Sequence, residues 1–158
     1  MTQAELRSRL CVLMGGYAAE RVVLGDTSSG AENDLKKATE LAFRMVAHFG
    51  MSPKIGPVFH EHRTEHPFLG QTLATEGGTS DATVRVIEEE TRELLSAAVK
   101  EAQALVKDHR QALDALVTVL LERETVEKEE LSRVLGPGVT APNALPAVPL
   151  DEAPSAVP

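Results

Sequence analysis

An all-α helical bundle is the fold class that this sequence predicts, and three observations lead to it. Apolar residues recur at spacings of three and four along several stretches, which is the period of amphipathic helices. Aromatic residues make up only 3% of the 158 residues and tryptophan is absent, so leucine, valine and alanine must build the core. Hydrophobic residues make up 42% of the chain, which is enough for one modest core.

The first helix is expected to begin at Thr2, because Glu5 lies three residues later and completes a capping box. It is expected to end at Gly25. In the middle, the pair Gly15-Gly16 lowers helix propensity by about 1 kcal/mol per glycine. Such a pair predicts either the close approach of another helix or a kink or break, and the sequence leaves these alternatives open.

The second helix is expected from about Ala31 to Phe49, with Ser29 as its N-cap. Its first turn carries Asp34, whose negative charge suits the positive end of the helix dipole. Behind it the apolar face repeats at Leu35, Ala38, Ala42, Met45 and Val46. The local pattern by itself predicts only that Asp34 interacts with the helix dipole.

Residues 51–79 are expected to form a long loop, since they carry several prolines and glycines and little periodicity. Loops of this length are usually functional or disordered. Three of the five histidines lie in this stretch, at His60, His62 and His66. Imidazoles suit Zn²⁺ or Ni²⁺, but the spacing follows no helical turn. We therefore expect adventitious metal binding here and not a built site.

Two further helices and a short final one are expected after the loop. The third begins at Ser80 or Asp81 and runs to about His109, the fourth covers residues 113–121, and the last ends near Leu135. Six of the nine prolines lie between Pro137 and Pro158. We therefore expect a helical domain over residues 1–135 and a disordered, Pro- and Ala-rich tail over residues 136–158.

The net charge indicates which partners the protein is not expected to bind, and the cysteine content indicates the cellular compartment in which it is expected. With 24 acidic and 16 basic residues the formal net charge is -8, which argues against a nucleic-acid partner. The single cysteine, Cys11, excludes an internal disulfide and a thiolate zinc cluster within one chain. No apolar run approaches the roughly 18 residues of a membrane span, and the polar N-terminus shows no signal peptide. A reducing, cytoplasmic location is the expectation.

Several short segments form an ordered set of motifs that is more specific than helical periodicity. They are Leu10-Cys11-Val12-Leu13-Met14-Gly15-Gly16-Tyr17-Ala18-Ala19-Glu20, Ser29-Gly30-Ala31-Glu32-Asn33-Asp34-Leu35, Phe49-Gly50-Met51-Ser52 and Gly56-Pro57-Val58. In this order they resemble the peptidase domain of FtsH-type proteases, which are membrane-tethered AAA+ zinc proteases. The resemblance covers most of residues 2–135 and implies the C-terminal, helical part of that domain.

In that family the Asp of the Asn-Asp-Leu triplet is the third zinc ligand, a role that the resemblance gives to Asp34. The other two ligands and the general base lie in a His-Glu-x-x-His helix upstream, and no histidine precedes Asp34 here. The stretch His60-Glu61-His62-Arg63-Thr64 has a threonine where the second histidine is needed. The phosphate-binding loop of an ATPase module is also absent from the sequence. Zinc is therefore expected only if another segment supplies the His-Glu-x-x-His helix, and no catalytic residue is assigned.

The resemblance implies a function in ATP-dependent proteolysis, in one of two forms. The first is a non-catalytic module that assembles with itself or binds another protein, such as an FtsH-like protease ring. The second is a fragment or subunit of an ATP-dependent zinc metalloendopeptidase whose His-Glu-x-x-His helix and ATPase are supplied elsewhere. A generic helical scaffold with no link to proteolysis is a third alternative.

Overall fold

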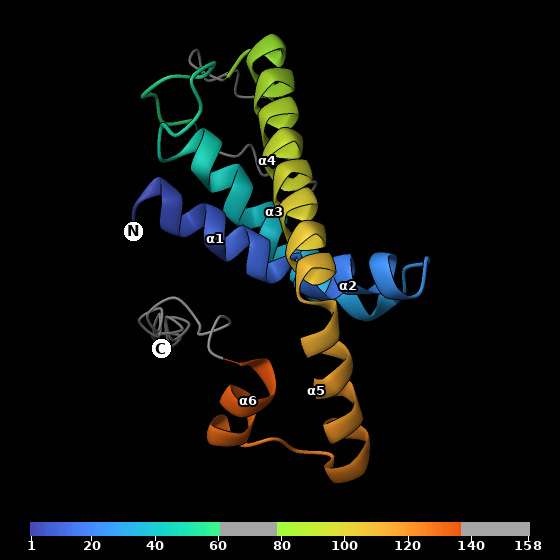
Figure 1. Cartoon of the computed structure of the whole chain (residues 1–158). Helices are drawn as coiled ribbons and strands as arrows, with labels where there is room; N and C mark the ends of the chain where they lie inside the picture. The colour runs from blue at the N-terminus through green and yellow to red at the C-terminus, as the bar shows by residue number, and fades with distance from the viewer. Residues whose placement is uncertain (61–78, 137–158) are drawn as a thin grey trace, which may run out of the picture. The chain divides into compact units, whose positions relative to one another are not determined.

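A computed structural model describes residues 1–60 and 79–136 of the protein. All regular structure within these residues is helical, which confirms the predicted fold class (Figure 1). The elements are α1 (Gln3–Leu13), α2 (Gly15–Val23), the 3₁₀-helix η1 (Ser29–Ala31), α3 (Glu32–Ala47), α4 (Asp81–Asp108), α5 (Arg110–Arg123) and α6 (Lys128–Leu135). The Pro-rich tail and two of the three loop histidines, His62 and His66, lie outside the described residues.

The predicted first helix is two helices. The capping box at its start is present, since the Glu5 N–H donates to Thr2 Oγ1 at 3.3 Å and the Thr2 N–H donates to Glu5 Oε2 at 2.6 Å. The helix then stops at Leu13 and restarts at Gly15. A Cβ atom added at Gly15 or Gly16 would meet nothing within 4 Å. The glycine pair therefore marks a helix break and not the close approach of a neighbour.

The N-cap predicted at Ser29 is wrong by one residue. Ser28 has extended backbone angles and its Oγ accepts from the Gly30 N–H at 3.1 Å, so it caps η1. An N-cap residue needs such a non-helical backbone, whereas Ser29 already lies in the 3₁₀ turn. The α-helix proper starts at Glu32, and the residue before it, Ala31, provides no side-chain cap.

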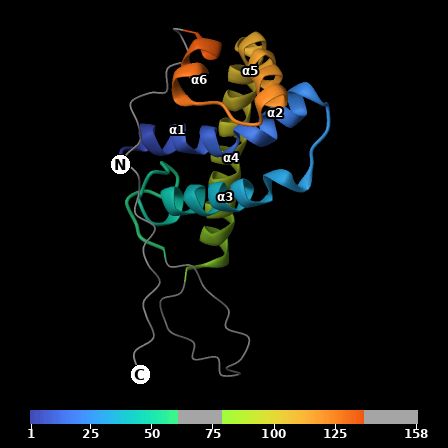
Figure 2. The ribbon, with the colours of Figure 1, turned by 90° about the horizontal axis from the view of Figure 1, so that it is seen from below.

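The core of the first unit, which spans Met1–His109, is formed where α1 and α3 lie side by side across α4 (Figures 1 and 2). Small residues line the contacts, and the alanines of the main buried cluster are Ala18, Ala38, Ala42, Ala98 and Ala102. Larger buried side chains fill the space between them, namely Leu6, Leu10, Met14 and Met45. Alanines at these positions let helix backbones approach closely. The predicted core of leucine, valine and alanine is found here with two methionines in place of valine, and Val46 is buried in a second cluster.

The chain turns sharply after α3. Gly50 has a positive φ of 62°, and a Cβ added there would lie 2.9 Å from the Cα of Pro57. The His60 N–H donates to the Ala47 carbonyl at 2.8 Å, which returns residues 48–60 to the end of α3. Both the backbone angle and the space therefore require glycine at residue 50.

Replacing Gly50 by alanine is expected to lower the free energy of unfolding by about 1–2 kcal/mol, because a left-handed backbone disfavours a Cβ. Gly16→Ala is the matched control, since it sits in a helix with open space around it and should stabilise by about 0.5 kcal/mol. Urea unfolding of both variants measures the difference. Equal stabilities would contradict this account of Gly50.

The second unit begins at Arg110 and holds α5 and α6. Arg123 and Glu130 join the two helices by an ion pair of 2.8 Å, and Arg110 pairs with Asp114 one turn along α5. No residue of either helix is buried. The helix boundary expected near His109 is confirmed. Among the described helices, none combines the length and the apolar character that a membrane span requires.

Candidate functional site

The turn that leads into α3 is held by Glu20, which lies on α2. The Ser28 N–H donates to Glu20 Oε2 at 2.7 Å, and the Ser28 hydroxyl donates to Glu20 Oε1 at 2.7 Å. The same hydroxyl oxygen accepts from the Gly30 N–H. One carboxylate therefore fixes the path of the chain at Ser28, the residue directly before η1, and links α2 to the start of α3.

These hydrogen bonds favour the ionised form of Glu20. The bond from the Ser28 backbone N–H, followed by the bond from its hydroxyl, holds the pKa of Glu20 below its ordinary value. A group with a lowered folded pKa stabilises above its unfolded pKa and loses that contribution as the pH falls through the folded pKa. The turn is therefore expected to loosen in acid.

Glu20→Gln is expected to speed hydrogen exchange at the Ser28 amide by about tenfold, because bonds to a charged acceptor are roughly twice as strong as neutral ones. The measurement is the protection factor of that amide at neutral pH. Glu32→Gln serves as the control, since it removes an exposed acid of α3 that makes no bond to Ser28. Unchanged protection in Glu20→Gln would show that the carboxylate does not hold the turn.

Asp34 lies in the first turn of α3, together with Glu32, and is partly exposed. Its carboxylate makes no hydrogen bond or ion pair with any residue in the described part of the chain. The position satisfies the helix dipole, as the local pattern predicts. Among the described residues, the two oxygens of Asp34 are therefore without a partner, a few residues after the turn that Glu20 and Ser28 hold.

His60 is the one described member of the predicted histidine group, and its Nδ1 lies 3.4 Å from the Thr79 hydroxyl. In residues 1–60 and 79–136, no three His, Cys, Asp or Glu side chains gather as a metal site would require. These residues alone do not fit a zinc ion. A zinc site that used Asp34 would need its other ligands from outside the described residues.

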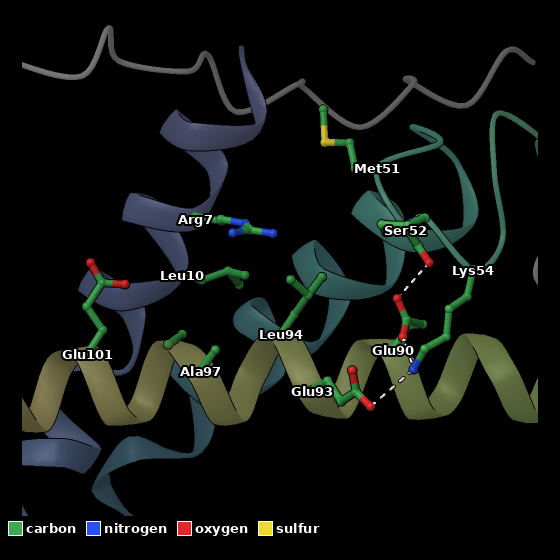
Figure 3. A pocket seen from close by; sticks show the side chains of 12 residues that line it. Arg7, Leu10, Met51, Ser52, Lys54, Glu90, Glu93, Leu94, Ala97 and Glu101 are labelled. Carbon is green, nitrogen blue, oxygen red and sulfur yellow. Dashed lines mark hydrogen bonds and ion pairs between the residues drawn. The ribbon is translucent and has the colours of Figure 1, made fainter.

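A second polar cluster ties the turn after α3 to the middle of α4 (Figure 3). The Ser52 hydroxyl donates to Glu90 Oε2 at 2.7 Å, and Lys54 Nζ lies 2.6 Å from Glu90 Oε1 and 3.3 Å from Glu93 Oε1. Ser52 and Glu90 are both buried. The bonds from Lys54 and then Ser52 lower the pKa of Glu90, against the effect of burial. The cluster is a structural link, because both oxygens of Glu90 face a partner.

Comparison with known proteins shows which family this helical chain belongs to. The sequence model of peptidase family M41 matches residues 1–134, which is most of the chain. The chain belongs to this family. The resemblance to FtsH-type peptidase domains is thereby confirmed, on a fold that has the expected helical elements.

Three curated M41 relatives show how much of a longer protein these residues match. The chain is 42% identical over 139 residues to ATP-dependent zinc metalloprotease FtsH 1 of Rhodopirellula baltica, covering 88% of this chain and 21% of the relative. It is 39% identical over 150 residues to FtsH 4 of Sphaerobacter thermophilus, covering 95% and 23%. It is 40% identical over 148 residues to FtsH of Rhodococcus erythropolis, covering 90% and 17%. The chain therefore spans about a fifth of the length of these relatives.

Sequence reasoning singled out Asp34, whose role as a metal ligand stays a prediction, and gave no role to Glu20 or Glu90. Glu90 lies three residues after the buried Ile87, so helical spacing alone could have shown that it faces inward. Its partner Ser52 is 38 residues away, and no local pattern predicts that pairing. Glu20 lies eight residues before Ser28, across a helix end and a turn. Its place in the motif shared with the M41 family drew attention to it, but no local pattern predicted its bond to Ser28.

Proposed function

We propose that these residues act as a non-catalytic, protein-binding module of ATP-dependent proteolysis. The observation that carries this proposal is membership of M41 in a sequence with no His-Glu-x-x-His motif. A zinc peptidase needs about three protein ligands and an open position for water, and Asp34 is the one ligand that the resemblance assigns here. The module then works through contacts with a second copy or with an FtsH-like ring, in the cytoplasmic compartment that its single cysteine favours.

A second function is favoured by Asp34 itself. Its carboxylate is unpartnered among the described residues and stands on a helix start held by Glu20. We infer that Asp34 completes a zinc site when a His-Glu-x-x-His helix is supplied from outside these residues. The metal would then activate water for peptide hydrolysis, while Glu20 and Ser28 keep Asp34 in position.

The chain alone is expected to show no turnover of casein at any Zn²⁺ concentration, because a single carboxylate does not hold a catalytic zinc ion. The measurement is release of labelled fragments over background. Turnover that disappears in Asp34→Ala and on chelation would overturn the non-catalytic proposal.

The role of Asp34 is tested through stability and not activity. If it acts only on the helix dipole, Asp34→Asn costs about 0.3–1 kcal/mol with or without Zn²⁺. If it binds metal, Zn²⁺ at a hundred times its dissociation constant stabilises the parent by about 2.7 kcal/mol more than the variant. His60, His62 and His66 are replaced by alanine in both proteins, so that loop histidines cannot supply the effect. We expect equal behaviour for the chain alone.

Protein binding is tested by mixing the chain with the upstream part of the R. baltica relative, which the M41 resemblance expects to carry the His-Glu-x-x-His helix. Co-elution of the two, with casein turnover that requires Asp34, supports the second function. Co-elution without turnover supports the non-catalytic module alone. Separate elution, together with a monomeric mass for the chain, would contradict both.

A further inference from the structure

The α5 helix carries two apolar stripes, and one of them faces α6. Arg123, in the last turn of α5, pairs with Glu130 of α6 at 2.8 Å, which fixes the side of α5 that is turned toward α6. Half-buried apolar residues continue this side at Ala112, Leu116 and Val119. They recur at spacings of three and four, as residues on one face of a helix do.

The second stripe of α5 is the more exposed one. It consists of Leu113, Val117, Leu120 and Leu121, again at helical spacing. Val117 is 45% exposed, Leu120 39% and Leu121 82%, so these side chains lie largely open within the described part of the chain. Residues 115–121 also carry no charge on any side of the helix. Such a run is typical of a buried helix, yet no residue of α5 is buried here.

Local interactions are weak support for this helix. α5 has 14 residues, and isolated helices shorter than about 12–15 residues are marginal in water. Its middle holds three β-branched residues in a row, Val117, Thr118 and Val119, which lowers helix propensity. Most helical stability in proteins comes from packing of an apolar face, and the second stripe is the face of α5 that remains for such packing.

Opposite charges stand at the two ends of the second stripe. Arg110 lies seven residues before Val117 and Glu124 lies seven residues after it, whereas Leu113 and Leu121 lie four residues to either side. In an antiparallel pair of α5 helices centred on Val117, Leu113 of one copy therefore meets Leu121 of the other, and Arg110 meets Glu124. A parallel pair would place like charges together at both ends, which is unfavourable.

The charge at each end is free to take part. Arg110 donates to Asp114 through Nε, which leaves its terminal nitrogens for a second carboxylate. The carboxylate of Glu124 makes no hydrogen bond or ion pair with any residue in the described ranges.

We propose that the second stripe of α5 binds α5 of a second copy of this chain, in an antiparallel pair with two-fold symmetry. The same patch then serves both copies, as a two-fold contact requires. This inference rests on the proposed function and deepens it, because it names a surface and a partner through which a non-catalytic module assembles. One helix pair is a small interface, so we expect a reversible dimer with a dissociation constant of about 10–100 µM.

The test is sedimentation equilibrium of the complete chain from about 1 to 500 µM, which brackets that constant. Leu121→Glu should weaken dimerisation at least tenfold without loss of helix content, since Leu121 is 82% exposed. Val12→Glu is the matched control, because it makes a similar change at an apolar residue of α1 that is 71% exposed, and it should have no effect.

A charge exchange tests the orientation of the two helices. Arg110→Glu should weaken the dimer several-fold, and adding Glu124→Arg in the same chain should restore it, because the exchanged charges meet again across the two-fold axis. A parallel pair would not be weakened by the single change and then restored by the double change.

The proposal is overturned if the chain stays monomeric up to about 500 µM, if Leu121→Glu dimerises like the parent, or if the double exchange restores nothing. A monomer that still co-elutes with the R. baltica fragment would overturn the α5 contact and leave the proposed function standing. A larger assembly that Leu121→Glu does not change would have the same meaning.

Discussion

Met45→Ala is expected to lower the free energy of unfolding by about 2–5 kcal/mol, the range found when a buried methionine or leucine is truncated. Met45 is 0% exposed on α3 and packs within the cluster that joins α1, α3 and α4. Its neighbours Ala38 and Ala42 are themselves too small to fill the space that the truncation opens. Urea unfolding measures the loss as a lower midpoint with little change in slope.

Leu35→Ala is the control for Met45. It truncates a side chain of similar size on the same helix, but Leu35 is 38% exposed, so the loss should stay near 1 kcal/mol or below. Both replacements put alanine in a helix, so differences in helix propensity cancel. Similar losses for the two variants would mean that the α1–α3–α4 contact is not the main core.

Glu90→Ala is expected to cost about 2–3 kcal/mol, because it leaves the buried Ser52 hydroxyl without its acceptor and removes packed methylenes. Glu90→Gln keeps an acceptor for Ser52 and should cost about 1 kcal/mol. Glu89→Ala removes the adjacent, exposed carboxylate and should change stability by less than about 0.5 kcal/mol. A Glu90→Ala loss no larger than that of Glu89→Ala would show that the cluster contributes nothing.

The contribution of Glu90 should also depend on pH. Since Lys54 and Ser52 lower its pKa in the folded protein, its stabilisation is fully present above the ordinary glutamate pKa, about 4.3. It is lost as the pH falls through the lowered pKa. The stability gap between the parent and Glu90→Gln should therefore close in acid. A gap that widened on acidification would contradict the ion pair.

Local chemistry in the sequence was sufficient to predict most of the helices and several of their ends. The Thr2–Glu5 capping box, the start of α4 behind Ser80 and the boundary near His109 are each set by residues within one turn of one another. The all-α class and M41 membership follow from the same kind of signal, one from apolar spacing and the other from short ordered motifs. The proposed boundary between a domain ending at residue 135 and a tail remains a prediction.

Tertiary packing determined features that the helical period of the apolar residues could not predict. Gly15-Gly16 was compatible with a close contact or a break, and only the empty space around both glycines shows a break. Ser28, Glu20 and Gly30 meet because α2 ends beside the start of α3, and Ser52 meets Glu90 because the turn after α3 folds onto α4. Helical spacing reports which face of one element is apolar. The partner of a polar group on another element depends on how the elements pack, and a single sequence does not contain that geometry.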